Sequence, residues 1–247
     1  MTIEQNDDLD GLKRAGHLVR DIREAMVART RAGITPLELD ALAGRMMAAA
    51  GARSAPMLAY SFPGHTCISV APAVAHGIPD DRPLEDGDLI NIDVSAELDG
   101  YWADTGISFV VGGTAGAAVG RLLQATRTAQ RKAMFAARAG QPINRIGRAV
   151  EREAGRHGFT VSPDLNGHGV GRSIHEAPTV WNVYRPHDRQ RLHKGLVLAI
   201  EPFLTPGSGR IVEDDDGWTL NAADGLPMAQ IEHTIVVTDK SPIVLTA

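Results

Sequence analysis

The sequence predicts an α+β protein made of two related halves, each with two helices followed by strands. Residues 31–36 and 138–143 are similar segments 107 positions apart, and each one precedes a helical pattern. Residues 86–93 and 194–201 are also similar, because each carries a glycine and an apolar strand that ends six positions later in an acid. A repeat of this kind favours a duplicated unit with a pseudo-two-fold axis, at which equivalent acids would meet.

The elements follow from hydrophobic periodicity and from residues that stop helices. Apolar residues recur at helical spacing from position 9, and Pro36 suits the first turn of a second helix. The segment 55–83 is rich in proline, glycine and serine, so we expect loops there around one short strand. In chain order, we expect helices at 9–30, 36–47, 115–139 and 143–157, and strands at 67–70, 196–200 and 230–238, with a hairpin at 91–105.

The hairpin turns at Asp99-Gly100, the pair favoured where both central residues need positive φ. This register places Ser95 opposite Asp104, with Asp93 on the same face and diagonal to Asp104. The other face is apolar and predicts a core: Ile92, Val94, Ala96, Leu98, Tyr101, Ala103 and Ile107. Two adjacent carboxylates repel each other unless a divalent cation lies between them. Taken alone, such a pair is more often a solvated acid on an exposed face and an acid that satisfies local backbone donors than a metal site.

Composition sets broad limits on the function. The 247 residues are 43% hydrophobic and 22% charged, which is typical of a globular chain, and we expect a single domain spanning residues 1–247. The net charge of −5 gives no case for a nucleic-acid partner. No apolar run approaches the ~18 residues of a membrane span, and the acidic start predicts no secretory signal. Cys67 is the single cysteine, which fits a reducing compartment, so we expect a cytoplasmic protein.

Two glutamates lie in apolar surroundings that predict burial. Five apolar residues precede Glu201, and Glu232 lies in the apolar strand pattern 231–237. A buried, unpaired carboxylate costs several kcal/mol or becomes protonated. Pairing with a basic residue would satisfy these acids, and so would a metal ion.

Three histidines have unusual surroundings. His168 lies in a glycine-rich segment that allows close backbone approach, His175 follows seven residues later, and His76 precedes Ile78-Pro79, where extended backbone is expected. We expect His233 to pack or to form a hydrogen bond beside Glu232. Four carboxylates and one neutral imidazole would balance two divalent ions in an oxygen-rich dinuclear site.

Eight segments together give the chain a specific resemblance. It resembles type I methionine aminopeptidases of the creatinase/aminopeptidase superfamily, whose "pita-bread" fold has two halves around a curved antiparallel sheet. The matching segments appear in the family's order at 76–79, 91–94, 103–105, 167–171, 175–178, 200–202, 216–219 and 230–234.

The resemblance implies hydrolysis of the first peptide bond of nascent proteins, releasing N-terminal methionine when the second residue is small. It implies that two divalent ions, of Co, Mn, Fe(II) or Zn, are held by Asp93, Asp104, His168, Glu201 and Glu232, with Asp104 and Glu232 bridging. It also implies that His76 and His175 contact the substrate and that Glu201 assists proton transfer. The expected partners are N-termini of nascent chains at the ribosome, with no membrane, and a monomer is the default.

By the same resemblance, Tyr60, Phe62, Cys67 and Trp218 line an apolar pocket for the methionine side chain. Two positions depart from the family pattern: Ile174 stands where Phe is usual, and Met57 where Cys is frequent. Both put the substrate range in question. Two alternatives remain: an Xaa-Pro peptidase of the same fold, and a non-enzymatic binding protein on this scaffold. The first usually has an additional N-terminal domain, and the second usually lacks metal ligands.

Overall fold

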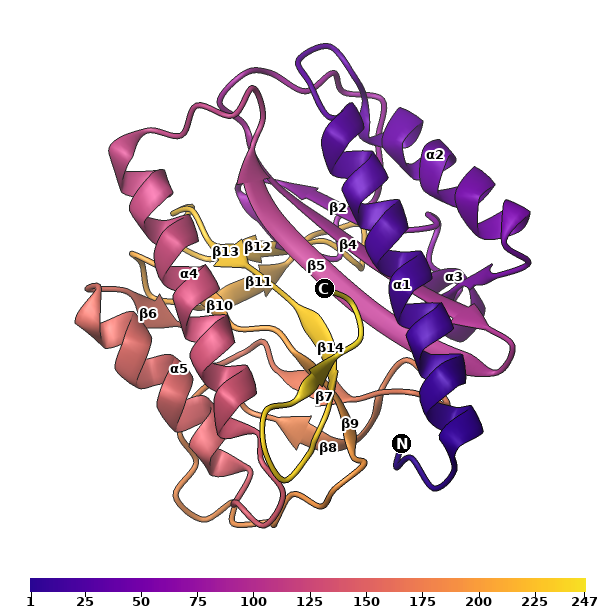
Figure 1. Cartoon of the computed structure of the whole chain (residues 1–247). Coiled ribbons are helices and arrows are strands. Elements are labelled where there is room, and N and C mark those ends of the chain that lie inside the picture. Colours follow the sequence, from indigo (N-terminus) through magenta and orange to yellow (C-terminus); the bar gives the residue numbers. More distant parts are fainter.

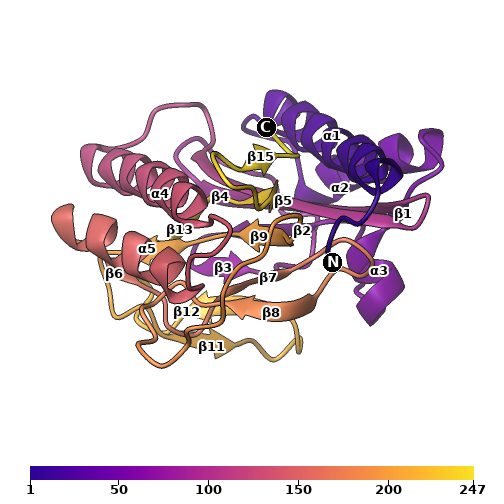
Figure 2. The ribbon, with the colours of Figure 1, turned by 60° about the horizontal axis from the view of Figure 1, so that its bottom comes forward.

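The structure is a computed structural model that describes residues 1–247, and its four long helices form two pairs, one for each half of the chain. In the first half, α1 (Asn6–Arg29) and α2 (Pro36–Ala49) pack together, and α1 covers the longest strands, β4 (Leu89–Leu98) and β5 (Tyr101–Val110). In the second half, α4 (Ala117–Ala136) and α5 (Asn144–Arg156) form the equivalent pair (Figure 1). The predicted duplication of helix pairs is confirmed, and a second view shows the strands beside both pairs (Figure 2).

The strands form four hydrogen-bonded sheets in which all strand pairs are antiparallel. In the first sheet, β4 pairs with β5 on one side and with β1 (Arg53–Ser54) and β2 (Cys67–Val70) on the other. The sheet of the second half has the order β15-β14-β9-β7-β8 (Ile243–Val244, His233–Val236, Val197–Ile200, Gly167–Gly169 and Glu176–Val180). Two three-stranded sheets complete the fold: β13-β10-β6 (Ala229–Gln230, Phe203–Thr205, Thr160–Val161) and β11-β12-β3 (Ile211–Glu213, Leu220–Ala222, Ala73–Ala75). The predicted α+β class is confirmed.

The hairpin has the predicted register. Asp99 and Gly100 both have positive φ, at 53° and 82°, and Ser95 lies opposite Asp104. The predicted core face packs under α1, with one exception. Ile107 lies outside the cluster under α1 and forms a β-bridge to Ile231 of the second half, and like Leu98 and Tyr101 it is half-buried.

Several elements differ from the prediction: strands β3, β6, β7, β8, β10, β11 and β12 were not expected, and further differences concern α1, α3 and the strand at 230–238. Helix α1 begins at Asn6, earlier than expected, because the Asp8 carboxylate accepts hydrogen bonds from the backbone N–H groups of residues 4 and 5 at its start. Residues 55–60, expected to be loop, form the short helix α3 (Ala55–Tyr60), capped by the Ser54 hydroxyl. The predicted strand 230–238 is interrupted at residues 231–232, between β13 and β14.

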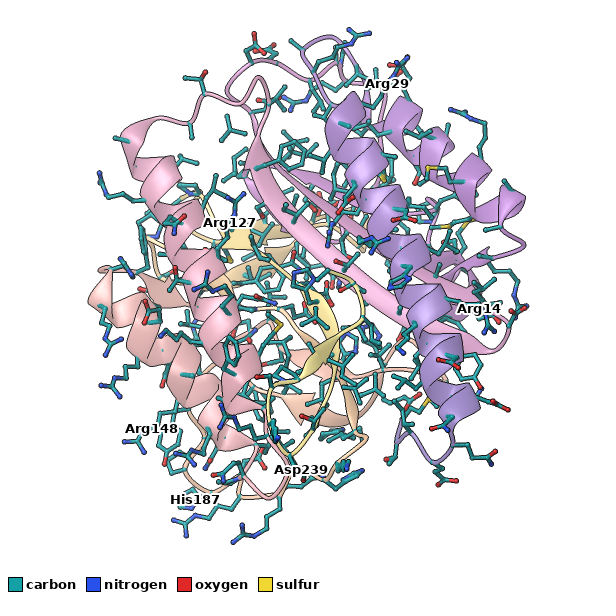
Figure 3. All side chains as sticks on the ribbon, in the orientation of Figure 1. Arg14, Arg29, Arg127, Arg148, His187 and Asp239 are labelled. Carbon is teal, nitrogen blue, oxygen red and sulfur yellow. The ribbon has the colours of Figure 1, made fainter.

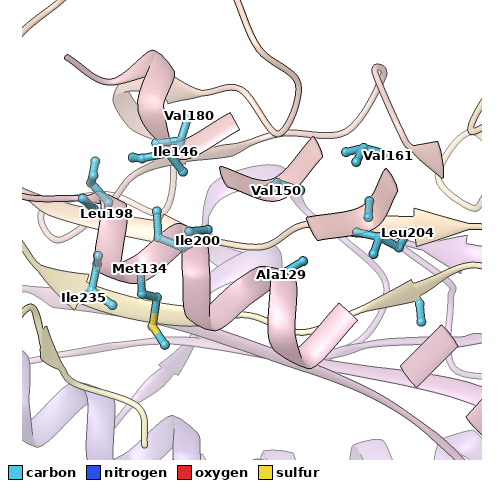
Figure 4. Packing of buried hydrophobic residues seen from close by; sticks show 14 of the residues in the cluster. Ala129, Met134, Ile146, Val150, Val161, Val180, Leu198, Ile200, Leu204 and Ile235 are labelled. Atoms are coloured by element: carbon cyan, nitrogen blue, oxygen red, sulfur yellow. The ribbon is translucent and has the colours of Figure 1, made fainter. Parts of the chain in front are cut away.

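The core of the second half lies between its helix pair and its sheets. Apolar side chains of α4 and α5 pack against side chains from β6, β8, β9, β10 and β14 in one buried cluster (Figure 4). The labelled members are Ala129, Met134, Ile146, Val150, Val161, Val180, Leu198, Ile200, Leu204 and Ile235. Burial of this face fixes β9 under the helices, and therefore fixes the position of Glu201 directly after that strand. None of the helices has the length and apolar character required to span a bilayer.

Candidate metal and active site

The five predicted metal ligands come from five strands or strand ends in both halves. Asp93 lies on β4 and Asp104 on β5, while His168 lies on β7. Glu201 follows β9 immediately, and Glu232 occupies the interruption between β13 and β14. In the second-half sheet, His168 pairs with Ala199, close to the end of β9 that leads to Glu201. The structure thus brings the equivalent acids of the repeat, Asp93 and Glu201, to one place.

Hydrogen bonds between β5 and the C-terminal strands hold the two halves together beside these ligands. The Thr234 hydroxyl accepts from Asp104 N–H at 3.0 Å and donates to the Asp104 carbonyl at 2.8 Å. Glu232 N–H donates to the Gly106 carbonyl at 2.9 Å, and the Thr105 hydroxyl donates to the Glu232 carbonyl at 3.0 Å. The backbone on both sides of the site is therefore fixed by the fold itself.

The ligand side chains are close and mostly buried. His168 Nε2 lies 3.3 Å from Glu201 Oε1 and 3.8 Å from Asp104 Oδ2. Ligand atoms of Asp104, His168 and Glu232 all lie within 4.8 Å of one another, and these three residues are less than 10% exposed. An oxygen-rich cluster of this size matches the donors that hard and borderline divalent cations prefer.

Without a cation, the buried carboxylates of this cluster repel one another. Burial, followed by the charge of Glu201, raises the pKa of Asp93 to about 7. Burial and the neighbouring carboxylates raise the pKa values of Asp104 and Glu232 well above their usual range. Burial alone would lower the pKa of His168, but its hydrogen bond to Glu201 and the charge of that carboxylate raise it. The protein therefore holds these acids together against their mutual repulsion.

Two carboxylate oxygens have no partner in the protein. Asp104 Oδ1 and Glu232 Oε1 are buried and form no hydrogen bond. The other oxygen of Glu232 accepts from Gln230 Nε2 at 3.1 Å, and Gln230 Oε1 accepts from Asn91 Nδ2 at 2.9 Å. One side of Glu232 is therefore oriented by an amide relay, while the free oxygen remains available to a cation, as the donor set of a metal site requires.

The predicted histidines lie beside this cluster. His175 packs edge-on against His168, with ring centroids 4.3 Å apart, and its Nδ1 is hydrogen-bonded to the Tyr60 hydroxyl. His76 has a left-handed backbone, with φ 53°. Both imidazoles line a cavity in which protein walls reduce their hydration. Burial, followed by His168, lowers the pKa of His175 to about 4, and burial lowers that of His76.

An apolar-walled cavity of about 300 Å³ opens beside the ligands. All four predicted pocket residues line it: Tyr60, Phe62, Cys67 and Trp218. The rings of Phe62 and Trp218 meet edge to face at 5.2 Å. The Asp216 carboxylate accepts from the backbone N–H groups of Trp218 and Thr219, both at 2.7 Å, and so fixes the loop that carries the indole.

The two departures from the family pattern lie in different places. Ile174 is buried and lines the cavity, whereas Met57 lies on the exposed surface of α3 and does not contribute to the cavity wall. Only Ile174 can therefore contact a side chain bound there.

The sequence analysis missed several supporting residues. These are Gln230, Thr234, Asp216 and Glu176, whose carboxylate accepts from the backbone N–H groups of residues 172 and 173 and closes the loop before His175. All four lie inside segments that carry the family resemblance, at 175–178, 216–219 and 230–234, but no role was assigned to them from the sequence. His233 was expected to form a hydrogen bond, and its Nδ1 is 2.9 Å from the Thr246 hydroxyl.

Comparison with known proteins gives one consistent result. Residues 10–239 match metallopeptidase family M24. Methionine aminopeptidase 2 of Bacillus subtilis is 45% identical, over 100% of this chain and 99% of its own. Human mitochondrial methionine aminopeptidase 1D is 34% identical, over 99% of this chain and 72% of its own. The crystal structure of methionine aminopeptidase from Rickettsia prowazekii superposes with a TM-score of 0.94 at 33% identity, covering all of both chains.

More distant structures share the fold alone. A prolidase from Pyrococcus horikoshii superposes with a TM-score of 0.77 at 23% identity, and this chain covers 63% of it. The pita-bread fold, the predicted family and the metallo-aminopeptidase class are thus confirmed, and the chain belongs to metallopeptidase family M24.

Proposed function

We propose that this protein removes N-terminal methionine by hydrolysing the first peptide bond of peptides whose second residue is small. The observation that carries the proposal is the meeting of five ligand-type side chains from both halves beside one apolar cavity. A cavity of about 300 Å³ suits one side chain of a substrate. The full-length relatives of the chain bear the name methionine aminopeptidase, which supports the same substrate.

The ligand set fits two divalent cations held by Asp93, Asp104, His168, Glu201 and Glu232. Asp104 and Glu232 would bridge the two cations, and their buried, unpartnered oxygens support this role because each carboxylate has an oxygen left for a cation. When bound, cations of Co, Mn, Fe(II) or Zn supply a water-derived nucleophile at neutral pH and polarise the scissile carbonyl. His168 donates its Nδ1–H to the Gly169 carbonyl at 2.9 Å, which leaves Nε2 as the ligand atom.

His175 serves as a hydrogen-bond donor to the reacting carbonyl oxygen. With a pKa of about 4, the imidazole is neutral at pH 7. Burial raises the pKa of Tyr60, so its hydroxyl keeps its proton and can donate a hydrogen bond to Nδ1 of His175. The imidazole proton is then on Nε2, and this donor stabilises charge that develops on the substrate oxygen.

Glu201 transfers the proton and His76 orients the substrate. The Glu201 carboxylate lies at the cavity wall beside His168, where it can take a proton from the nucleophile and return it to the leaving amine. His76 lines both the apolar cavity and the adjoining cleft of about 660 Å³. Its neutral ring is therefore placed to hold the peptide group between the first and second residues.

Tyr60, Phe62, Cys67 and Trp218 bind the methionine side chain. Its thioether is flexible and polarizable, and it contacts aromatic rings favourably. Burial, followed by the charges of Asp93 and Asp104, raises the pKa of the Cys67 thiol well above its usual value, so it remains a neutral wall of the pocket.

Hydrolysis of Met-Ala-Ser by the metal-loaded protein tests this function directly. We expect release of methionine from Met-Ala-Ser and no cleavage of an Xaa-Pro dipeptide. Cleavage of Xaa-Pro alone would favour the alternative of a proline-directed peptidase. Metal binding without hydrolysis of either peptide would favour the binding protein.

The finer parts of the proposal have their own checks. We propose that residues 1–247 act as one domain, because both halves supply ligands to one site. Metal analysis of the purified protein measures the number and identity of the ions. Action on nascent chains at the ribosome, the cytoplasmic location and the monomeric state remain predictions.

A further inference from the structure

The charge of the chain is unevenly distributed. Residues 115–158 and 181–194 carry thirteen lysines and arginines and only three acids, a net charge of +10. The rest of the chain then carries −15, although the whole has only −5. The overall charge, which predicts no nucleic-acid partner, therefore hides a strongly basic region.

These two segments lie together in the fold. The Ile143 and Gly140 N–H groups donate to the carbonyls of Gln190 and Leu192, and Asn144 Nδ2 donates to the Arg185 carbonyl. The segment 181–194 is therefore fixed against the beginning of α5. Figure 3 shows Arg148 and His187 close together at the same edge of the molecule, on the side of α4 and α5.

An open groove of about 710 Å³ is lined by α4, α5 and the segment between them, and we call it the basic groove. Its charged lining residues are Lys132, Arg138, Arg145, Arg148, Arg152, Arg156 and Glu153. Glu153 is buried and accepts from Arg156 at 3.1 Å, so the one acid in the lining is already paired. None of the other five cations forms an ion pair within the protein, although Arg148 lies over the Tyr184 ring at 5.6 Å.

The spacing of the arginines suits a polymer of regularly spaced anions. Arg148, Arg152 and Arg156 are four residues apart on α5, which places neighbours roughly 5–6 Å from each other on one face. From Arg145 to Arg156 the row extends about 16 Å, at about 1.5 Å rise per residue. A row of exposed guanidinium groups matches successive phosphates, because each guanidinium can bind a phosphate through two N–H donors.

The remaining composition of the groove distinguishes between anionic partners. Phe135 is 49% exposed at the groove and offers a ring on which a base can stack. The only other apolar lining residues are two alanines, whereas helices that bind membrane surfaces insert a broad apolar face. No residue of the basic groove lines the active-site cavity or its adjoining cleft.

We propose that the basic groove binds the phosphodiester backbone of a polynucleotide, which docks the protein without occupying its active site. Binding of this kind releases counterions, so its affinity falls steeply with salt concentration. It is largely independent of sequence, because backbone contacts carry no base information. It also leaves hydrolysis of a short peptide unchanged.

The test compares two triple variants with equal charge change. Arg145→Gln, Arg148→Gln and Arg152→Gln alter the groove, while Arg29→Gln, Arg31→Gln and Arg45→Gln alter exposed arginines near the ends of α1 and α2. Fluorescence anisotropy measures binding of an RNA hairpin and of a DNA hairpin with the same sequence, at several salt concentrations. Because RNA and DNA share the phosphodiester backbone, comparing the two hairpins shows whether the groove prefers one of them.

We expect the groove variant to lose at least about tenfold in affinity and to show a salt slope lower by about 2–3, since each phosphate contact contributes about 0.9. The control variant should stay within about threefold of the natural protein. Equal losses in both variants would overturn the proposal, as would failure of the natural protein to bind either hairpin. Tighter binding to phosphatidylserine vesicles or polyglutamate than to RNA would also overturn it.

A second groove variant and folding measurements distinguish loss of binding from loss of folding. Lys132→Gln with Arg138→Gln changes the opposite wall of the groove and should lower affinity in the same direction. Circular dichroism melting and hydrolysis of Met-Ala-Ser monitor folding in every variant. Because anisotropy does not require turnover, a failure of the proposed peptidase function would leave this test intact.

Discussion

The two halves supply metal ligands in different ways. Asp93 and Asp104 lie within ten-residue strands of a regular hairpin, so the alternation of the strands alone places them on one face. Glu201 lies at the end of β9, and Glu232 lies in a strand interruption, where hydrogen bonds to Thr105 and Gly106 of β5 hold its backbone. The ligand positions in the first half are thus determined by strand register, whereas the position of Glu232 in the second half depends on packing against the first half.

The largest effect should come from removing one ligand in each half. Asp104→Asn and Glu201→Gln preserve shape but remove charge from the cluster. If the halves form one joint site, both should reduce kcat/KM by at least about a thousandfold and lower metal content. His175→Ala should keep its metal and lose mainly kcat, because the imidazole is not among the proposed metal ligands and acts on the reacting carbonyl. Loss of metal from His175→Ala, measured by elemental analysis, would contradict these roles.

Metal removal should expose the repulsion between the two halves as a pH-dependent loss of stability. In the metal-free protein the pKa of Asp93 is about 7, above its unfolded value of about 3.9. Its contribution to stability is therefore fully present below about pH 4 and is lost as the pH rises through about 7. The raised pKa values of Asp104 and Glu232 act in the same direction.

Thermal melting at about pH 5.5 and pH 8 measures this effect. The metal-free protein should melt at a lower temperature at pH 8, with each 1 kcal/mol lost lowering Tm by about 2–4 °C. Readdition of Co²⁺ or Mn²⁺ should raise Tm more at pH 8, because fewer protons compete for the ligands. A Tm that is unaffected by chelation and readdition at both pH values would refute a metal site in this cluster.

A smaller effect should follow from weakening the contact between the halves. Thr234→Val keeps the shape but leaves the buried N–H and carbonyl of Asp104 without their side-chain partner. We expect a loss of about 2–3 kcal/mol in unfolding free energy and weaker metal binding. Thr128→Val is a matched control, since that exposed hydroxyl bonds only to its own helix. Equal changes in denaturant midpoint for the two variants would show that this contact is unimportant.

The smallest effect concerns the pocket. Ile174→Phe restores an aromatic wall and should change discrimination by about 1 kcal/mol, the lower end of what one group in an apolar pocket contributes. The protein with Ile174 should accept norleucine or leucine somewhat better, relative to methionine, than the variant does. Values of kcat/KM on Met-Ala-Ser, norleucine-Ala-Ser and Leu-Ala-Ser check this. Identical ratios would mean that residue 174 does not contact the substrate, and Met57→Cys should leave them unchanged.

Prediction from sequence succeeded where local rules determine the structure. The Asp99-Gly100 turn fixed the hairpin register, and hence the neighbouring positions of Asp93 and Asp104. Pro36 marked the start of α2, where the Thr35 hydroxyl accepts from Glu38 N–H. The family resemblance extended this to the remaining site residues, which the structure places around one cavity.

The rest depends on contacts between distant segments. The interruption at Glu232 arises because residue 231 pairs with Ile107 while residues 233–236 pair with β9, and no local pattern records that change of partner. Gly106 shows the same limit. A Cβ at this position would lie 2.2 Å from Gln230 Oε1, and residue 230 is remote in sequence. Helix α3 was missed because its six residues are too few for a periodic signal.

The separation of charge has a consequence for how the molecule behaves in bulk solution. A body with +10 in one region and −15 elsewhere is a strong electric dipole, whatever its isoelectric point. It should be retained by a cation-exchange resin at pH 7.5, where a protein with a calculated pI of about 6.0 is expected to flow through. It should also bind an anion exchanger under the same buffer, through the acids of the remaining chain. Retention on both resins, with elution by modest salt, would show that the protein binds each resin through the region of opposite charge.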